Sequence, residues 1–159
     1  MTELFAWMES TAFAIWVRES PSQFAYTGML FLHAVGLALC VGISVVIALR
    51  VLGVLTNIPA MALAHLFRPL WIGFWMNFVS GTVMLTSDIS REMANGVFRL
   101  KLVFVLLASV TMWLIQRALG PAPVDLRPAR TLSAAALVFW TVAVTFGRFV
   151  AYPKLLGFN

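Results

Sequence analysis

The chain has 159 residues, of which 62% are hydrophobic and only 11% are charged, and its mean hydropathy is +0.95. A soluble domain carries roughly 25% charged residues on its water-facing surface, so this composition excludes an ordinary soluble fold. The net charge of +5 comes from basic residues that stand singly at the ends of apolar segments. That pattern excludes a nucleic-acid partner and is typical of residues that anchor helices in a lipid bilayer.

Residues 3–18 mix large apolar side chains with charged ones and are too short and too polar to span a bilayer. We expect an amphipathic helix that lies in the membrane interface, and the alternative is a frayed terminus. The acidic start lacks the basic n-region of a signal peptide, so we expect no cleavage. Pro21 then changes the chain direction.

Four apolar segments follow, each long enough to supply the roughly 20 helical residues that cross a hydrocarbon core. They run from about 22 to 49, 63 to 86, 97 to 119 and 131 to 150. Strands are disfavoured because an open sheet edge cannot exist in lipid. The connections are short, so neighbouring segments should pack antiparallel. The sequence therefore predicts an all-α membrane protein: one domain over 1–159, built as a four-transmembrane-helix bundle with an N-terminal interfacial helix.

Four spans would place both termini on one side of the membrane, here named the A end, and two loops on the other, the B end. The B end carries Arg50, Arg68, Arg117, Arg127 and Arg130 against the single acid Asp125. The A end carries Arg18, Arg91, Arg99, Lys101, Arg148 and Lys154, together with five acids. The raw basic counts are nearly equal, but three of the A-end cations lie inside spans. The positive-inside rule then predicts a cytoplasmic B end and periplasmic termini.

Ionisable and polar groups inside a bilayer are costly, so each one is a functional candidate. At 1.5 Å per residue, His33 lies ~16 Å from the A end and Asn77 ~14 Å, with Thr141 at a similar depth. On the first span Gly36, Cys40 and Ser44 share the helical face of His33, which predicts a face packed against protein. We predict a polar pocket that opens to the A end near Asp88. Its lining residues are His33, Asn77, Thr141 and Thr145, with Lys101 and Arg148 at the opening.

Structural interpretations stand beside this one. A lone His or Asn in a bundle often only bonds across helices, and Lys101 and Arg148 are then cations that snorkel to the interface. Haem b is a candidate cofactor because histidine is a common iron ligand. His65 differs from His33 by ~11 Å in depth, which argues against one haem held by both. A haem on His33 as the only metal ligand, a haem shared across a dimer, and a quinone held by His33 and Asn77 remain open.

Two short motifs carry a resemblance. They are Leu32-His33-Ala34-Val35-Gly36 continuing to Cys40-Val41-Gly42, and Phe98-Arg99-Leu100-Lys101. On these motifs the chain resembles small four-helix bacterial inner-membrane proteins of unknown function and the membrane domain of copper-resistance D-type proteins. The resemblance implies a multi-pass protein of the bacterial inner membrane that handles copper or supports a redox process. The sequence departs from a copper site in having no Met or His cluster around His33.

No nucleophile with a base, paired carboxylates or phosphate-binding loop appears, so an independent enzyme is not expected. The leading hypothesis is an accessory membrane protein that binds haem b or a quinone around His33, as a homo-oligomer or part of a larger membrane complex. The alternative is a structural or assembly subunit with no ligand of its own. A third, weaker idea is a metal-ion permease.

Overall fold

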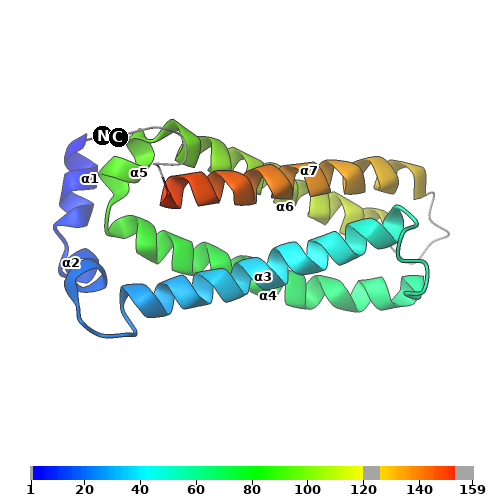
Figure 1. Ribbon diagram of the computed structural model, residues 1–159, viewed down its shortest axis with the longest axis horizontal. Coiled ribbons are helices and arrows are strands. Elements are labelled where there is room, and N and C mark those ends of the chain that lie inside the picture. Colours follow the sequence, from blue (N-terminus) through cyan, green and yellow to red (C-terminus); the bar gives the residue numbers. More distant parts are fainter. Residues whose placement is uncertain (1, 120–125, 153–159) are drawn as a thin grey trace.

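The computed structural model describes residues 2–119 and 126–152, and every regular element in those ranges is an α-helix (Figure 1). In chain order the helices are α1 (Thr2–Glu9), α2 (Ala12–Glu19), α3 (Tyr26–Val51), α4 (Ala60–Thr86), α5 (Ile89–Ala94), α6 (Gly96–Ala118) and α7 (Leu126–Ala151). The predicted all-α class is confirmed. Asp125 and Lys154, which were counted in the charge balance of the two ends, lie outside the described residues.

Three helices are long and apolar enough to cross a membrane, which confirms the membrane class. They are α3, α6 and residues Ala129–Ala151 of α7. The fourth long helix, α4, has 27 residues but is not among them. Its hydropathy is lowered by polar and small residues on one side, Gly73, Asn77, Ser80 and Gly81. A bilayer crossing by α4 therefore stays a prediction.

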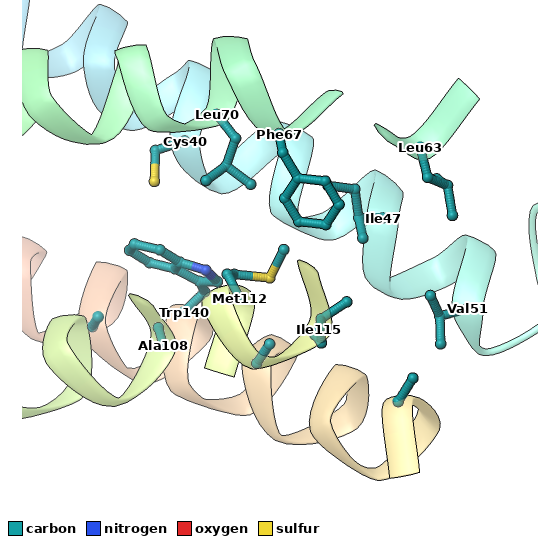
Figure 2. Packing of buried hydrophobic residues seen from close by; sticks show 13 residues of the cluster. Cys40, Ile47, Val51, Leu63, Phe67, Leu70, Ala108, Met112, Ile115 and Trp140 are labelled. Atoms are coloured by element: carbon teal, nitrogen blue, oxygen red, sulfur yellow. The ribbon is translucent and has the colours of Figure 1, made fainter. Parts of the chain in front are cut away.

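The long helices pair as two hairpins. α4 packs along the full length of α3, α7 packs along α6, and a shorter contact between α3 and α7 joins the hairpins (Figure 1). Figure 2 shows the core that this contact creates, with Ile47, Phe67 and Leu70 of the first hairpin facing Met112, Ile115 and Trp140 of the second. Burial of these side chains positions the B-end half of each hairpin relative to the other.

Polar contacts add to the packing at this same B end of the bundle. Trp71 Nε1 donates to Gln116 Oε1 at 2.7 Å and so joins α4 to α6. The Arg117 guanidinium lies 3.7 Å from the ring centroid of Trp113, and Arg50 Nε donates to the carbonyl oxygen of Ile58. These aromatic and basic contacts fit the anchoring role predicted for the B-end arginines.

The N-terminal segment differs from the single helix predicted over 3–18. It forms two helices, because Thr11 accepts a hydrogen bond from the amide of Ala14 and caps the start of α2. Ala14 and Val17 are fully buried, so one face of α2 packs on the protein. The outer surface keeps large exposed apolar side chains, which include Leu4, Trp7, Phe13 and Trp16.

Two hydrogen bonds fasten this segment over the A end. Glu9 Oε1 accepts from the Ser90 amide at 2.7 Å, and Arg18 Nη1 donates to the Ser87 carbonyl at 3.3 Å. The bonds from Ser90 hold the pKa of Glu9 below its usual value. Ser90 belongs to α5, a short helix inside the short connection predicted between the spans 63–86 and 97–119. Asn95 then caps α6 by accepting from the Val97 amide.

Candidate functional site

The candidate site begins where α3 and α4 approach most closely. A Cβ atom on Gly36 would lie 2.6 Å from the backbone nitrogen of Asn77, and one on Gly73 would lie 2.8 Å from the nitrogen of Cys40. Only glycine permits this separation, as in other closely packed membrane helices. Gly36, Cys40 and Ser44 are all buried, so the prediction that this face of the first span is packed against protein is confirmed.

His33 and Asn77 meet just beyond this contact, on the A-end side. His33 Nδ1 lies 3.0 Å from the backbone oxygen of Asn77, and Asn77 Nδ2 donates to the backbone oxygen of His33 at 2.8 Å. Ser80 Oγ lies 3.3 Å from the same ring nitrogen. A Cβ on Gly81 would come within 2.9 Å of His33 Cε1, so the ring fits against a glycine. The structure therefore brings together two of the residues predicted to line one pocket.

The hydrogen bonds define what the imidazole can still do. A carbonyl oxygen only accepts, so the Nδ1 contact with Asn77 requires the proton on Nδ1. In the neutral ring Nε2 then carries the free lone pair. The hydrogen bonds of the His33 ring involve Nδ1 only. Nε2 forms no hydrogen bond with the described part of the chain, and it is not among the fully enclosed side-chain atoms there. It is thus the ring nitrogen that can accept a hydrogen bond or ligate a metal.

A shallow groove of about 430 Å³ lies beside this site, on the face formed by α3 and α4. Ser80 is its polar member and links it to His33. The other lining residues are apolar: Met29, Leu32, Trp75, Met76, Val79 and Val83. The groove is open on one side, and His33 and Asn77 are not among its lining residues.

The predicted pocket residues of α7 are exposed and make their polar contacts within α7, unlike His33 and Asn77. Thr141 and Thr145 are exposed, and their hydroxyls donate to the carbonyls of Leu137 and Thr141 at 2.7 and 2.8 Å. Arg148 is also exposed, with its guanidinium 4.3 Å from the ring centroid of Tyr152. These contacts do not join α7 to His33, and a ligand-binding role for the three residues stays a prediction.

Lys101 and Glu92 form a second polar group near the A end. The half-buried Lys101 side chain lies over Gly147, where its Cε is 3.5 Å from the position a Cβ would occupy. Glu92 Oε1 is 3.6 Å from Arg91, and its Oε2 is enclosed without a hydrogen-bond partner among the described residues. Burial raises the pKa of Glu92, and the Arg91 charge acts in the opposite direction.

Sequence reasoning missed Glu92 as a site residue because it counted the stretch as a loop. Ile89 and Glu92 stand three residues apart, and a helical reading of the segment would have placed the acid beside a buried apolar position. His65, the other histidine, is exposed near the start of α4. Within residues 2–119 and 126–152 no three His, Cys, Asp or Glu side chains gather as a metal site.

Comparison with known proteins gives no relative: no family model, no curated protein and no solved structure matches the chain. The resemblance to copper-resistance D-type membrane domains thus stays a prediction that depends on the two short motifs.

Proposed function

We propose that this protein is a small accessory membrane protein that binds a redox cofactor at His33. The observation that carries the proposal is the hydrogen bonding of the ring. Nδ1 is tied to the Asn77 carbonyl, while Nε2 has no hydrogen-bond partner among the described residues. Metal-ligating histidines usually donate their other N–H to a carbonyl or carboxylate in this way, and the same arrangement suits acceptance of a hydrogen bond from a ligand. A free imidazole nitrogen at membrane depth is expensive unless a partner uses it.

A quinone fits the surroundings better than haem b. The groove beside Ser80 is lined by apolar side chains, and exposed members such as Leu32, Trp75 and Val79 open it towards lipid. A quinone dissolves in the hydrocarbon phase and can enter this groove, which adjoins His33 through Ser80. Haem b needs an axial ligand on at least one face, which Nε2 can supply. The test therefore looks for both cofactors, and we expect the bound one to be a quinone.

The proposal includes a membrane arrangement. α4 crosses the bilayer with α3, α6 and α7, the B end faces the cytoplasm, and both termini lie on the periplasmic side of a bacterial inner membrane. The supporting observation is that α4 packs along the whole of α3 through Gly36 and Gly73, so the two helices share one depth range. The protein acts within a homo-oligomer or a larger membrane complex.

A structural or assembly subunit is the second candidate. It is favoured by the fact that His33 and Asn77 already satisfy each other across α3 and α4. In that case the His33–Asn77 pair only holds α3 against α4. Interhelical polar contacts of this kind stabilise membrane bundles by roughly 0.6–2 kcal/mol without any ligand. The two candidates differ in whether the purified protein holds a ligand that depends on His33.

The test compares wild type with His33→Ala and with His65→Ala as a matched control, because His65 is exposed and lies apart from the site. Each protein is purified from native membranes in mild detergent, its visible spectrum is taken oxidised and reduced, and its quinone content is measured after solvent extraction. The proposal expects bound quinone or haem in wild type and His65→Ala, and loss of it in folded His33→Ala. Absence of both cofactors from all three proteins would favour the assembly subunit.

A further inference from the structure

Near the B end, a side-chain hydrogen bond between α4 and α6 marks the edge of the core. Trp71 Nε1 of α4 donates to Gln116 Oε1 of α6 at 2.7 Å, so the two helices meet at this level. Phe67 and Met112, each four residues before the bonded residue of its helix, are buried and belong to the core (Figure 2). The core therefore lies on the same side of this bond for both helices.

One arginine from each helix lies on the other side of the bond. At about 100° per residue, Arg68 stands about 60° further round α4 than Trp71, and Arg117 about 100° further round α6 than Gln116, in both cases away from the core. Both arginines are exposed. The outer side of the crossing between α4 and α6 thus carries two positive charges from two different helices.

Each of these arginines stands at the B end of an exposed apolar row. Apolar side chains lie four and seven residues from it in the direction of the A end, a spacing that keeps them on one helix face. They are Ile72 and Trp75 on α4, and Trp113 and Val110 on α6. Their exposed fractions lie between 42% and 58%, so both rows face the lipid that surrounds the bundle. Trp75 also borders the groove beside Ser80.

The Arg117 side chain is held by the tryptophan of its own row. Its guanidinium lies 3.7 Å from the ring centroid of Trp113, and a guanidinium stacked on a ring keeps the N–H groups at its edge for another acceptor. Within the described residues no carboxylate oxygen lies within 4.0 Å of Arg68 or Arg117. The sequence supplies only one acid at this end, Asp125, so the charge here is strongly positive.

We propose that the outer side of the α4–α6 crossing binds one anionic phospholipid from the leaflet at the B end. Arg68 and Arg117 donate to its phosphate, because the planar fork of an arginine matches two phosphate oxygens. Its acyl chains lie along the two exposed rows. Basic sites between membrane helices bind anionic headgroups in this way, and tryptophan is typical of the headgroup level. This inference does not depend on the site at His33.

The test is a titration of the full-length protein in mild detergent, followed by native mass spectrometry. The probes are dioleoylphosphatidylglycerol and dioleoylphosphatidylcholine, which have the same acyl chains and differ in headgroup charge. The variants are Arg68→Gln, Arg117→Gln and Arg117→Lys. Arg130→Gln is the matched control, because Arg130 is an exposed arginine at the same end but belongs to α7. Calorimetry with sn-glycerol 3-phosphate tests the phosphate without acyl chains.

We expect wild type to bind one phosphatidylglycerol more tightly than phosphatidylcholine. Arg68→Gln and Arg117→Gln should each weaken phosphatidylglycerol by roughly 5- to 10-fold, the effect of one arginine at an anionic lipid. Arg117→Lys should restore part of the loss, since it keeps the charge without the planar fork. Arg130→Gln should leave the affinity unchanged, and sn-glycerol 3-phosphate should bind far more weakly than the lipid.

Three results would overturn the inference. Wild type that does not distinguish the two lipids would show that no site selects an anionic headgroup. An Arg130→Gln loss equal to those of Arg68→Gln and Arg117→Gln would mean that the lipid responds only to the total charge of the B end. Binding of sn-glycerol 3-phosphate as tight as that of the lipid would mean that the ligand is a free phosphate compound.

Discussion

Asn77 and His33 each bond to the backbone of the other's helix, since the Asn77 amide donates to the His33 carbonyl at 2.8 Å and the His33 ring lies 3.0 Å from the Asn77 carbonyl. The exchange fixes the rotation and the register of α3 against α4 at one point. It also determines which nitrogen of the imidazole remains free. Structural and functional roles of His33 thus depend on the same pair of hydrogen bonds.

Removing the amide should loosen the first hairpin. Asn77→Ala deletes the bond to the His33 carbonyl, and we expect it to lower the free energy of unfolding by roughly 0.6–2 kcal/mol. The measurement is a denaturant titration of the detergent-solubilised protein. Thr82→Ala is the matched control, because the exposed Thr82 hydroxyl bonds within its own helix to Phe78. Equal effects of the two substitutions would contradict the interhelical role of Asn77.

Because α3 and α4 approach closely at Gly36 but not at Gly42, we expect alanine substitutions at these two glycines of α3 to differ in their effect on stability. Gly36→Ala would place Cβ 2.6 Å from the Asn77 backbone, which cannot move without separating the helices. We expect a loss of stability of roughly 1–3 kcal/mol, as for other overpacked contacts. Gly42→Ala meets nothing within 4 Å and should be neutral or slightly stabilising, because alanine favours helix. Thermal unfolding of both variants checks the contrast, and a tolerated Gly36→Ala would show that the helices lie further apart.

Glu92 gives a pH dependence with a definite sign. Burial raises its pKa in the folded protein above the ordinary value of 4.5, so the folded state binds the proton more tightly than the unfolded chain. Stability therefore falls as pH rises from 4.5 through the raised pKa, and this loss is complete above it. Glu92→Gln should be more stable than wild type at pH 7, and the difference should vanish towards pH 4.

Melting temperatures across this pH range measure the Glu92 effect. The exposed Glu3→Gln variant is the control and should follow wild type throughout. A Glu92→Gln protein less stable than wild type at pH 7 would mean that the attraction of Glu92 to Arg91 and Lys101 outweighs the cost of its burial.

The number of spans and their orientation can be tested with single cysteines. Cys40 is the only cysteine and is buried, so Cys40→Ala gives a background without reactive thiols. A cysteine at exposed Asn57, between α3 and α4, should be protected from an impermeant maleimide in right-side-out vesicles. One at exposed Ser90, in α5, should be labelled. Labelling of both would show that α4 does not cross, and the reverse pattern would show that the B end is outside.

The long helices were predictable from the sequence because length and apolarity suffice for them. The predicted segment 97–119 agrees within one residue at each end with α6, Gly96–Ala118. The packed face of α3 was predictable as well, since helical periodicity alone places Gly36 and Cys40 beside His33. The break at Thr11 and the helix α5 were not predicted, because both depend on local capping within polar segments where hydropathy carries no information.

The candidate site was only partly predictable for a related reason. Depth along a helix placed His33 and Asn77 at one level, and glycine contacts then brought them together. Thr141 shares a similar depth but points away from the core, because the buried face of α7 is defined by Ala136, Trp140 and Ala143. The depth of a residue along a helix does not tell whether its side chain faces the core or the surroundings of the bundle, so depth alone could not place Thr141.

The proposed function requires that His33 Nε2 is the atom that binds the cofactor. The most direct measurement is the ¹⁵N NMR spectrum of protein with labelled histidine in a His65→Gln background, so that the ring signals belong to His33. We expect a protonated Nδ1 and an unprotonated Nε2, and on addition of decylubiquinone or haemin a shift of Nε2 with little change at Nδ1. A protonated Nε2, or a spectrum that neither probe changes, would contradict the claim.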